Sequence, residues 1–177
     1  VYVSKLEIGP KGPFIMLSRS HYGFVKRLLE IEIPELSDGT VMLYSVARDA
    51  GSRTKIAVYT DYANVEPLGA VIGEKGRRIA SVLKELGGEK IDVVLYDKDP
   101  AKFIANALSP AKNVKVTIKD ESKKEALAVV PDDNLSLAIG RKGQNVKLAS
   151  RLTHYKIEVK SESAMLEDEV VYTTKDD

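Results

Sequence analysis

Apolar and polar positions recur along this chain with two periods, which predict a succession of strands and helices. Short runs rich in branched and aromatic residues, such as 55–60 and 90–96, are typical of strands. Elsewhere apolar residues are spaced by three and four, as at Ile79, Val82 and Leu86, which predicts one buried helix face. The pattern therefore favours a mixed α/β (α+β) fold.

The chain opens with two apolar runs around a turn rich in glycine and proline. Residues 1–3 and 14–17 predict two strands, and residues 9–13 predict the turn between them. A two-stranded hairpin is marginally stable in water by itself. We therefore expect the chain to come from a longer protein, and residues 1–18 to be the end of a truncated β-domain.

Residues 19–97 predict a first α/β module. Ser20 is a candidate cap for a helix that stops before residues 33–34, and a hairpin follows. Pro67 suits the first turn of a short helix, and a longer helix stops at Gly87. A strand closes the module.

Residues 98–161 predict the same order of elements again. A helix begins at Asp99 and Pro100, a hairpin follows, and two helices flank a glycine loop. The predicted strands are 114–118, 127–130 and 156–160, and the apolar face of the last helix is expected at Val146, Ala149 and Leu152. The remainder, residues 162–177, is expected to be an acidic tail, either a linker or a disordered end.

The repeat holds residue by residue. A shift of 67 positions places Gly73 on Gly140 and Gly76 on Gly143, and it also matches the flanking helices. Chance similarity seldom preserves loop, helix and strand together. The sequence therefore predicts two copies of one module.

Both copies carry a basic loop with two glycines three residues apart. Glycines let the backbone approach a ligand closely, and the start of the following helix offers free N–H groups to a phosphate. The candidate binding residues are Ile72, Gly73, Glu74, Lys75, Gly76, Arg77, Arg78, Ile139, Gly140, Arg141, Lys142, Gly143, Gln144, Asn145 and Lys147. Glu74 would repel a phosphate, so we expect the first loop to bind more weakly than the second.

Charge changes this picture once it is divided along the chain. The net charge is +1, but residues 162–177 carry −5 and the preceding residues therefore carry +6. A basic body favours a polyanionic partner such as nucleic acid. With no cysteine and only two histidines, His21 and His154, we expect no metal site and no cofactor. The apolar runs are too short to span a bilayer and no signal segment opens the chain, so we expect a cytoplasmic protein with no membrane partner.

Two other classes of function remain open. An enzyme could use the glycine loops as nucleotide-phosphate sites, but neither loop ends in lysine followed by serine or threonine, and no nucleophile and base are paired. Asp132 and Asp133 are better explained as caps of the following helix than as a metal site. A protein-interaction scaffold is the third class, and it applies chiefly to the first module.

The loops, IGEKGRRI at 72–79 and IGRKGQNV at 139–146, resemble those of K-homology (KH) domains. KH domains clamp about four nucleotides of single-stranded nucleic acid, with the GxxG loop on the backbone. The helix and hairpin before each loop resemble the type II arrangement. The resemblance implies a three-stranded mixed sheet packed on helices in each module.

Longer strings narrow the resemblance. GGEKID at 87–92, FIANALSPA at 103–111 and VPDDNLSLAIG at 130–140 are similar to the NusA family of bacterial transcription elongation and termination factors. The resemblance implies an OB-fold domain before the tandem KH modules, of which residues 1–18 would be the end. It also implies a non-enzymatic, monomeric region that binds single-stranded nascent RNA, with RNA polymerase and other elongation factors as partners of the full-length protein, in pausing, termination and antitermination.

Further basic residues are candidates to extend such an RNA track. They lie in the first hairpin and between the modules, at Arg48, Arg53, Lys55 and Lys112.

Overall fold

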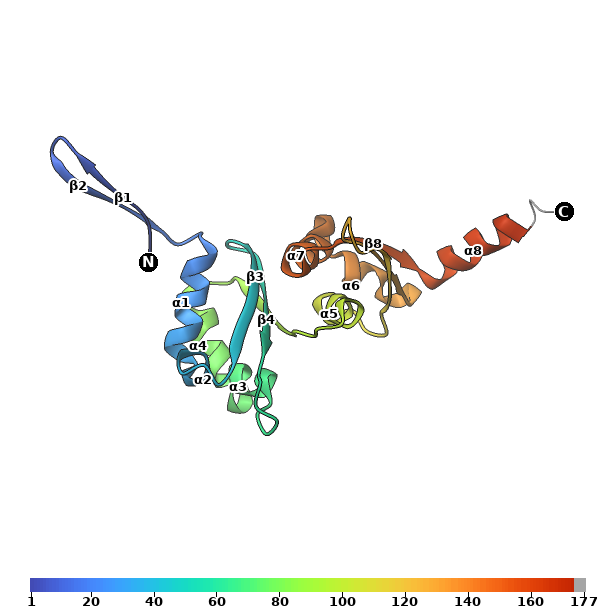
Figure 1. Cartoon of the computed structure of the whole chain (residues 1–177), viewed down its shortest axis with the longest axis horizontal. Helices are drawn as coiled ribbons and strands as arrows, with labels where there is room; N and C mark the ends of the chain where they lie inside the picture. Colours follow the sequence, from blue (N-terminus) through green and yellow to red (C-terminus); the bar gives the residue numbers. More distant parts are fainter. Residues whose placement is uncertain (174–177) are drawn as a thin grey trace. The chain divides into compact units, whose positions relative to one another are not determined.

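The computed structural model describes residues 1–173, and the chain divides into two compact units (Figure 1). The first unit is Val1–Val93 and the second begins at Val94. Each unit contains one copy of the repeated module. The predicted order of helices and strands is confirmed in both.

The first unit opens with the predicted hairpin. Strands β1 (Tyr2–Gly9) and β2 (Gly12–Ser18) pair antiparallel, with Gly9 opposite Gly12 at the turn. Most side chains of both strands are exposed. The ring of Tyr2 stacks on that of His21, 4.2 Å away between centroids, which joins the hairpin to the first helix.

The module of the first unit packs its helices on a three-stranded sheet. In the sheet the order is β3-β4-β5, with β3 antiparallel to β4. Branched residues from the sheet and from α1, α3 and α4 form its core, in which Leu29, Ile56, Val71 and Val82 are fully buried. The elements are α1 (Tyr22–Glu32), α2 (Pro34–Ser37), β3 (Met42–Asp49), β4 (Arg53–Tyr59), α3 (Pro67–Ile72), η1 (Glu74–Gly76), α4 (Arg77–Leu86) and β5 (Lys90–Leu95).

Two details of this unit differ from the prediction. The cap of α1 is His21, whose Nδ1 accepts a hydrogen bond from the Gly23 N–H at 2.9 Å, and not Ser20. The imidazole nitrogen reaches the second residue of the helix as a shorter side chain would. The chain also turns once more into α2 after α1, with Pro34 at the first helical position, where its missing N–H costs nothing.

The second unit repeats this architecture. Its sheet has the order β6-β7-β8, and β7 pairs antiparallel with β6 and parallel with β8. The Asp99 side chain caps α5 through the Ala101 N–H, as predicted. The elements are α5 (Pro100–Ala107), β6 (Lys115–Asp120), β7 (Glu125–Val130), η2 (Asp132–Asn134), α6 (Leu135–Ile139), η3 (Arg141–Gly143), α7 (Gln144–Thr153), β8 (Lys156–Ser161) and α8 (Glu162–Thr173).

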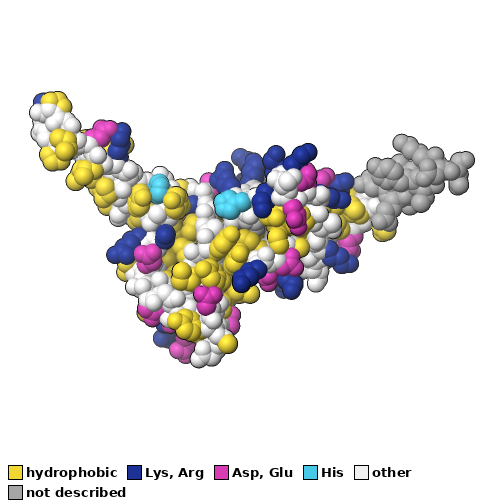
Figure 2. Space-filling view, viewed as in Figure 1, with side chains coloured by type: hydrophobic (Ala, Val, Ile, Leu, Met, Phe, Trp, Pro, Cys, Tyr) yellow, Lys and Arg dark blue, Asp and Glu magenta, His cyan; other side chains and the backbone are white. Residues whose placement is uncertain are grey.

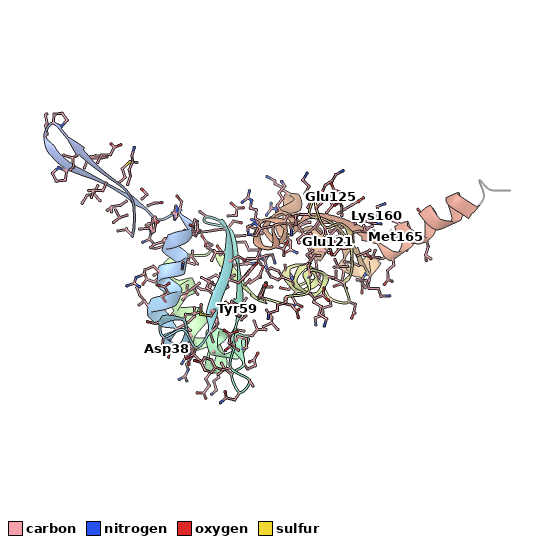
Figure 3. The ribbon with its side chains drawn as sticks, in the orientation of Figure 1. Asp38, Tyr59, Glu121, Glu125, Lys160 and Met165 are labelled. Carbon is pink, nitrogen blue, oxygen red and sulfur yellow. The ribbon has the colours of Figure 1, made fainter. Side chains whose placement is uncertain are left out.

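The acidic tail, expected to be a linker or a disordered end, begins with a helix. Residues Glu162–Thr173 form α8, which directly follows β8; Lys160 of β8 and Met165 of α8 are labelled in Figure 3. Asp132 accepts hydrogen bonds from the backbone N–H and the hydroxyl of Ser163, so its carboxylate caps α8 rather than α6. Residues 174–177 of the predicted tail lie outside the described residues.

Candidate nucleic-acid interface

The two glycine loops have the same backbone conformation. Gly73 and Gly140 have φ of 78° and 76°, and Gly76 and Gly143 have φ of 71° and 74°. Between them Lys75 and Lys142 both have φ of 55°, a left-handed value that is uncommon for a residue other than glycine. In each loop the N–H of the second glycine donates to the carbonyl of the first at 3.1 Å. The sequence repeat is therefore also a repeat of shape.

The first glycine of each loop is required for space. A methyl group at Gly140 would lie 2.7 Å from Cβ and from the backbone nitrogen of Asn145, and one at Gly73 would lie 2.7 Å from Cγ of Arg78. At Gly76 no atom would lie within 4 Å. The first glycine thus lets the loop fold back against its own helix.

Exposed basic side chains surround the backbone of both loops. Lys75 and Arg77 are exposed at the first loop, and Arg141 and Lys142 at the second. Lys147 donates to the carbonyl of Lys142 at 3.3 Å, so its ammonium also steadies the loop that it borders. Figure 2 shows Lys and Arg side chains gathered along the upper edge of the second unit.

The first loop borders a groove of mixed charge. The groove has a volume of about 420 Å³ and is lined by Glu35, Gly69, Ala70, Gly73, Glu74, Arg77 and Arg78. Glu74 is exposed there, as its place in the loop predicts. Two carboxylates thus line this groove, and one of them, Glu74, stands where the second loop has Arg141.

Arg78 is held within the first unit. Its guanidinium forms an ion pair with Glu35 and donates to the carbonyl of Ala70 at 2.8 Å. Packed over Gly73, the side chain braces the loop instead of reaching out from it. We therefore assign Arg78 to the support of the loop, whereas the sequence placed it among the binding residues.

Asn145 holds the equivalent place in the second unit. Its side chain is 3% exposed, and Nδ2 donates to the carbonyls of Leu108 and Ala138 at 3.1 and 2.9 Å. A side chain so buried cannot contact RNA, so the interpretation of Asn145 as a binding residue requires correction. Its spacing from Leu148, Ala149 and Leu152 was the signal that it belongs to the buried face.

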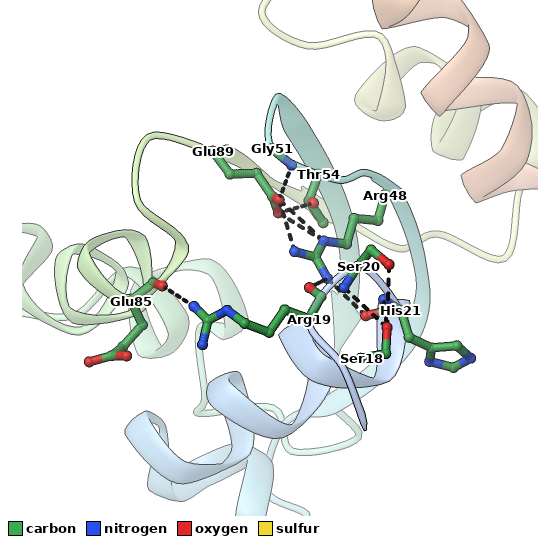
Figure 4. Close-up of polar contacts among 9 residues, drawn as sticks. All are labelled: Ser18, Arg19, Ser20, His21, Arg48, Gly51, Thr54, Glu85 and Glu89. Carbon is green, nitrogen blue, oxygen red and sulfur yellow. Dashed lines mark hydrogen bonds and ion pairs between the residues drawn. The ribbon is translucent and has the colours of Figure 1, made fainter. Parts of the chain in front are cut away.

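The candidate cation Arg48 lies in a buried polar cluster (Figure 4). Its guanidinium pairs with Glu89 at 3.0 Å, and the two side chains are only 6% and 1% exposed. The same guanidinium donates to the backbone carbonyls of Arg19 and His21 at 2.6 and 2.8 Å. Arg48 therefore ties the segment before α1 to the sheet, a contact over long sequence separations that no local pattern could have indicated.

Glu89 is the acceptor at the centre of this cluster. Besides Arg48 it accepts from the Gly51 N–H at 2.7 Å and from the Thr54 hydroxyl at 2.7 Å. Burial acts to raise the pKa of Glu89, but these hydrogen bonds outweigh it, so the pKa lies below its usual value. The carboxylate remains charged and matched to Arg48.

Arg53 and Lys55 share one carboxylate. Arg53 Nε lies 2.7 Å and Lys55 Nζ lies 2.9 Å from Oδ2 of Asp92. Burial acts to raise the pKa of Asp92, but the hydrogen bond from Arg53 and the charge of Lys55 lower it below its usual value. Burial of the Lys55 ammonium, whose side chain is fully buried, lowers the pKa of that lysine despite the attraction of Asp92. We assign these two candidate RNA contacts to packing.

Lys112 is the one candidate of that group with an exposed side chain. Its backbone N–H donates to Oδ1 of Asn134 at 2.9 Å, which fixes the turn between α5 and β6 against η2. The described residues contain no group of three or more His, Asp or Glu able to hold a metal ion. Within the same residues, no helix has the length and apolarity needed to cross a membrane.

In each unit two helices flank a GxxG loop and pack on a three-stranded sheet, and a helix and the hairpin of that sheet precede the loop. This arrangement defines a KH domain of type II. The chain carries two such domains in tandem. Residues 19–96 match the NusA-like first KH domain, and residues 100–167 match the NusA-like second KH domain. The chain therefore belongs to the NusA family and comprises its tandem KH region.

Individual relatives agree with this family. The transcription termination/antitermination protein NusA of Halalkalibacterium halodurans is 52% identical over 173 residues, which are 95% of this chain and 45% of that protein. The corresponding figures for the NusA of Bacillus subtilis are 53%, 92% and 44%, and for that of Thermus thermophilus 47%, 89% and 40%. The chain thus spans less than half the length of these relatives.

A solved structure shows the same fold. The crystal structure of APE1850 matches with a TM-score of 0.52 at 25% identity, over 77% of this chain and 96% of that one.

Proposed function

We propose that this chain is a single-stranded RNA-binding region in which both GxxG loops hold the RNA backbone. The observation that carries the proposal is the repeated loop: two glycine-flanked lysines at φ 55°, each followed by a helix start with exposed cations. Backbone N–H groups at such a helix start attract phosphate, and neighbouring Lys and Arg side chains add charge. The RNA contacts are assigned to Ile72, Gly73, Lys75, Gly76, Arg77, Ile139, Gly140, Arg141, Lys142, Gly143, Gln144 and Lys147.

In the full-length protein this region would act on transcription in the cytoplasm. The relatives are named for transcription termination and antitermination. We propose that binding of nascent RNA here modulates pausing, termination and antitermination by RNA polymerase, without catalysis, and that the region acts as a monomer. Residues 1–18 would then be the last strands of an OB-fold domain, which would cover exposed apolar side chains such as Phe14.

The proposal predicts a strong loss of binding when the second loop is reversed in charge. In Arg141→Asp with Lys142→Asp, both side chains are exposed, so the fold should survive while RNA affinity falls by a factor on the order of 100. Fluorescence anisotropy with a random-sequence RNA pool measures the affinity, and circular dichroism checks the fold. Because Glu74 already weakens the first loop, Lys75→Asp with Arg77→Asp should lose less.

A matched control changes the net charge by the same amount in the same unit. Lys102 of α5 and Lys115 of β6 are exposed and belong to neither the loop nor the helices that flank it, so Lys102→Asp with Lys115→Asp should bind RNA nearly as the parent does. If the control and the loop variant lost the same RNA affinity, the loss would follow from net charge alone. That result would refute the loops as the binding site.

A further inference from the structure

A basic groove lies at the end of α7 that is remote from the GxxG loop. There the end of α7 meets the turn between β6 and β7 and the start of β8. The open groove has a volume of about 490 Å³. It is lined by Lys123, Lys124, Ser150, Arg151, His154, Tyr155, Lys156 and Ile157.

The lining carries four full positive charges and no carboxylate. Among the described residues, no ion pair joins Lys123, Lys124, Arg151 or Lys156 to an acidic side chain. The Lys124 ammonium lies 5.2 Å from the centre of the Tyr155 ring, which leaves it attracted to a ring face but not neutralised. Unpaired cations around a hollow attract an anion of matching extent.

Acidic residues stand near the groove without closing it. Glu121 and Glu125 belong to the same hairpin and are labelled in Figure 3. Neither lines the groove; Glu125 lines a separate hollow beside it, with Lys119 and Glu158. Lys156 lines both hollows and is the register partner of Glu125, so the lining itself carries only positive charge, and a carboxylate borders it on one side.

Two of the lining side chains occupy backbone positions that favour glycine. Lys124 has φ of 55° and His154 has φ of 61°. At the place of His154 the first unit has Gly87, with φ of 63°, and at the place of Lys124 it has Ser52, whose φ is not positive. Left-handed φ is unfavourable for a residue with a Cβ atom, so the second unit bears a local strain that the first avoids. The result is two larger polar side chains in the groove.

The same end of the first unit is closed by its own chain. Where the second unit has Tyr155, the first has Glu89, which holds Arg48 and through it the carbonyls of Arg19 and His21. In both units the turn and the last strand are joined by one hydrogen bond, Lys90 N–H to Ser52 and Lys156 N–H to Lys124, at 3.0 and 2.7 Å. The two units thus have the same backbone arrangement at this end, but only the second unit presents an open basic surface there.

We propose that this groove is a second binding site for the phosphodiester backbone of single-stranded RNA. It takes the nucleotides beyond those held at the Gly140–Gly143 loop, and it therefore rests on the proposed RNA-binding function. α7 has ten residues, so the loop and the groove are roughly 15 Å apart along one rigid helix. A strand leaving the loop reaches the groove within a few nucleotides, which favours RNA over an acidic protein segment as its occupant.

The test compares two lengths of RNA on the whole chain. A random pool of about 4 nucleotides fills one clamp and leaves no RNA over, whereas a pool of about 16 leaves RNA free to enter the groove. Lys123→Glu with Arg151→Glu should lower affinity for the longer pool about tenfold and that for the shorter pool less than twofold. Lys102→Glu with Lys115→Glu, equal in charge change and outside the groove, should leave both affinities near those of the parent.

His154→Gly separates binding from folding. Glycine suits φ of 61°, so this variant should melt at the same or a higher temperature while binding the longer pool more weakly. Unchanged affinity of the Lys123 and Arg151 variant for the longer pool overturns the groove proposal, and then an acidic protein segment or no ligand at all occupies it. That result leaves the loops untouched, because their failure would appear as full binding of the shorter pool by Arg141→Asp with Lys142→Asp.

Discussion

Lysine and arginine side chains of this chain fall into two groups that burial separates. Arg48 and Lys55 are buried against Glu89 and Asp92, whereas Arg141 and Lys142 extend from a loop into solvent. A buried cation is costly unless it is paired, so the first group stabilises the fold only together with its partners. Exposed cations cost little and stay available for a phosphate.

The shared carboxylate of Asp92 gives a stability prediction. Asp92→Asn leaves Arg53 and the buried Lys55 without their common carboxylate, so the free energy of unfolding should fall by about 3 kcal/mol. Urea unfolding at neutral pH measures the loss. Asp61→Asn, an exposed change in the same unit, should cost less than about 0.5 kcal/mol.

The same carboxylate sets a dependence on acid. The pKa of Asp92 in the folded protein lies below the value of about 3.9 for an exposed aspartate. The ion pair therefore contributes fully above about pH 4, and its contribution is lost as the pH falls through the folded-state pKa. Asp92→Asn should show a smaller fall in stability than the parent between neutral pH and about pH 3; an equal fall would contradict this role of Asp92.

How far the sequence predicts the site differs from residue to residue. The GxxG loops were predictable because glycine spacing, charge and repetition are all local signals. The pairing of Arg48 with Glu89 was not, since the two residues are far apart in sequence and only the folded sheet brings them together. His21 as a cap and α8 as a helix were missed for a related reason, because each is fixed by neighbours that the sequence does not show.

Among the elements, α7 has one end on the proposed clamp and the other on the basic groove. Its first turn is fixed from within by Asn145, whose amide joins α6 and α5 by hydrogen bonds to Ala138 and Leu108. Arg78 joins α4 to α2 and α3 through Glu35 and Ala70. Different side chains thus perform one structural task at equivalent positions, which the sequence repeat alone did not reveal.

This brace can be tested by two changes at one position. Asn145→Ala removes the buried amide that joins α7 to the Ala138 and Leu108 carbonyls, of which Leu108 keeps only the Ala111 N–H, so the second unit should lose about 2 kcal/mol of unfolding free energy. Asn145→Asp keeps the shape but places a carboxylate beside those carbonyls and should lose at least as much. Urea unfolding and RNA affinity are measured together, and an aspartate variant as stable as the parent would contradict the hydrogen-bond pattern.

At the scale of the whole molecule, two modules would multiply the proposed RNA contact of a single loop. Linked sites act on one ligand at a high effective concentration, so the affinity for one strand exceeds that of either site. Unequal loops are then sufficient, provided that both engage the same RNA. The topology of each module was predictable from the order of its strands and helices. The folded structure was needed to see that the end away from the loop is closed by the Arg48–Glu89 cluster in the first module and forms an open basic groove in the second.

The salt dependence of RNA affinity measures how the phosphate contacts are shared between the two loops. The logarithm of the RNA affinity should fall linearly with the logarithm of salt concentration, with a slope of about −0.7 for each phosphate contacted. Reversing charge at Arg141 and Lys142 should make this negative slope shallower by about 1.4, and reversal at Lys75 and Arg77 should change it by less. A slope near zero for the parent would mean that phosphates are not held.

The Arg48 joint also bears on which positions can drift in evolution. Its donors bind main-chain carbonyls at residues 19 and 21, and every amino acid supplies such a carbonyl. Substitution at residues 19 and 21 leaves these two bonds intact. Loss of Glu89, in contrast, removes the acceptor that the Arg48 guanidinium, the Gly51 N–H and the Thr54 hydroxyl share. The joint therefore depends on the side chains of Glu89 and Arg48 but only on the main chain at residues 19 and 21, where the His21 side chain is needed separately to cap α1.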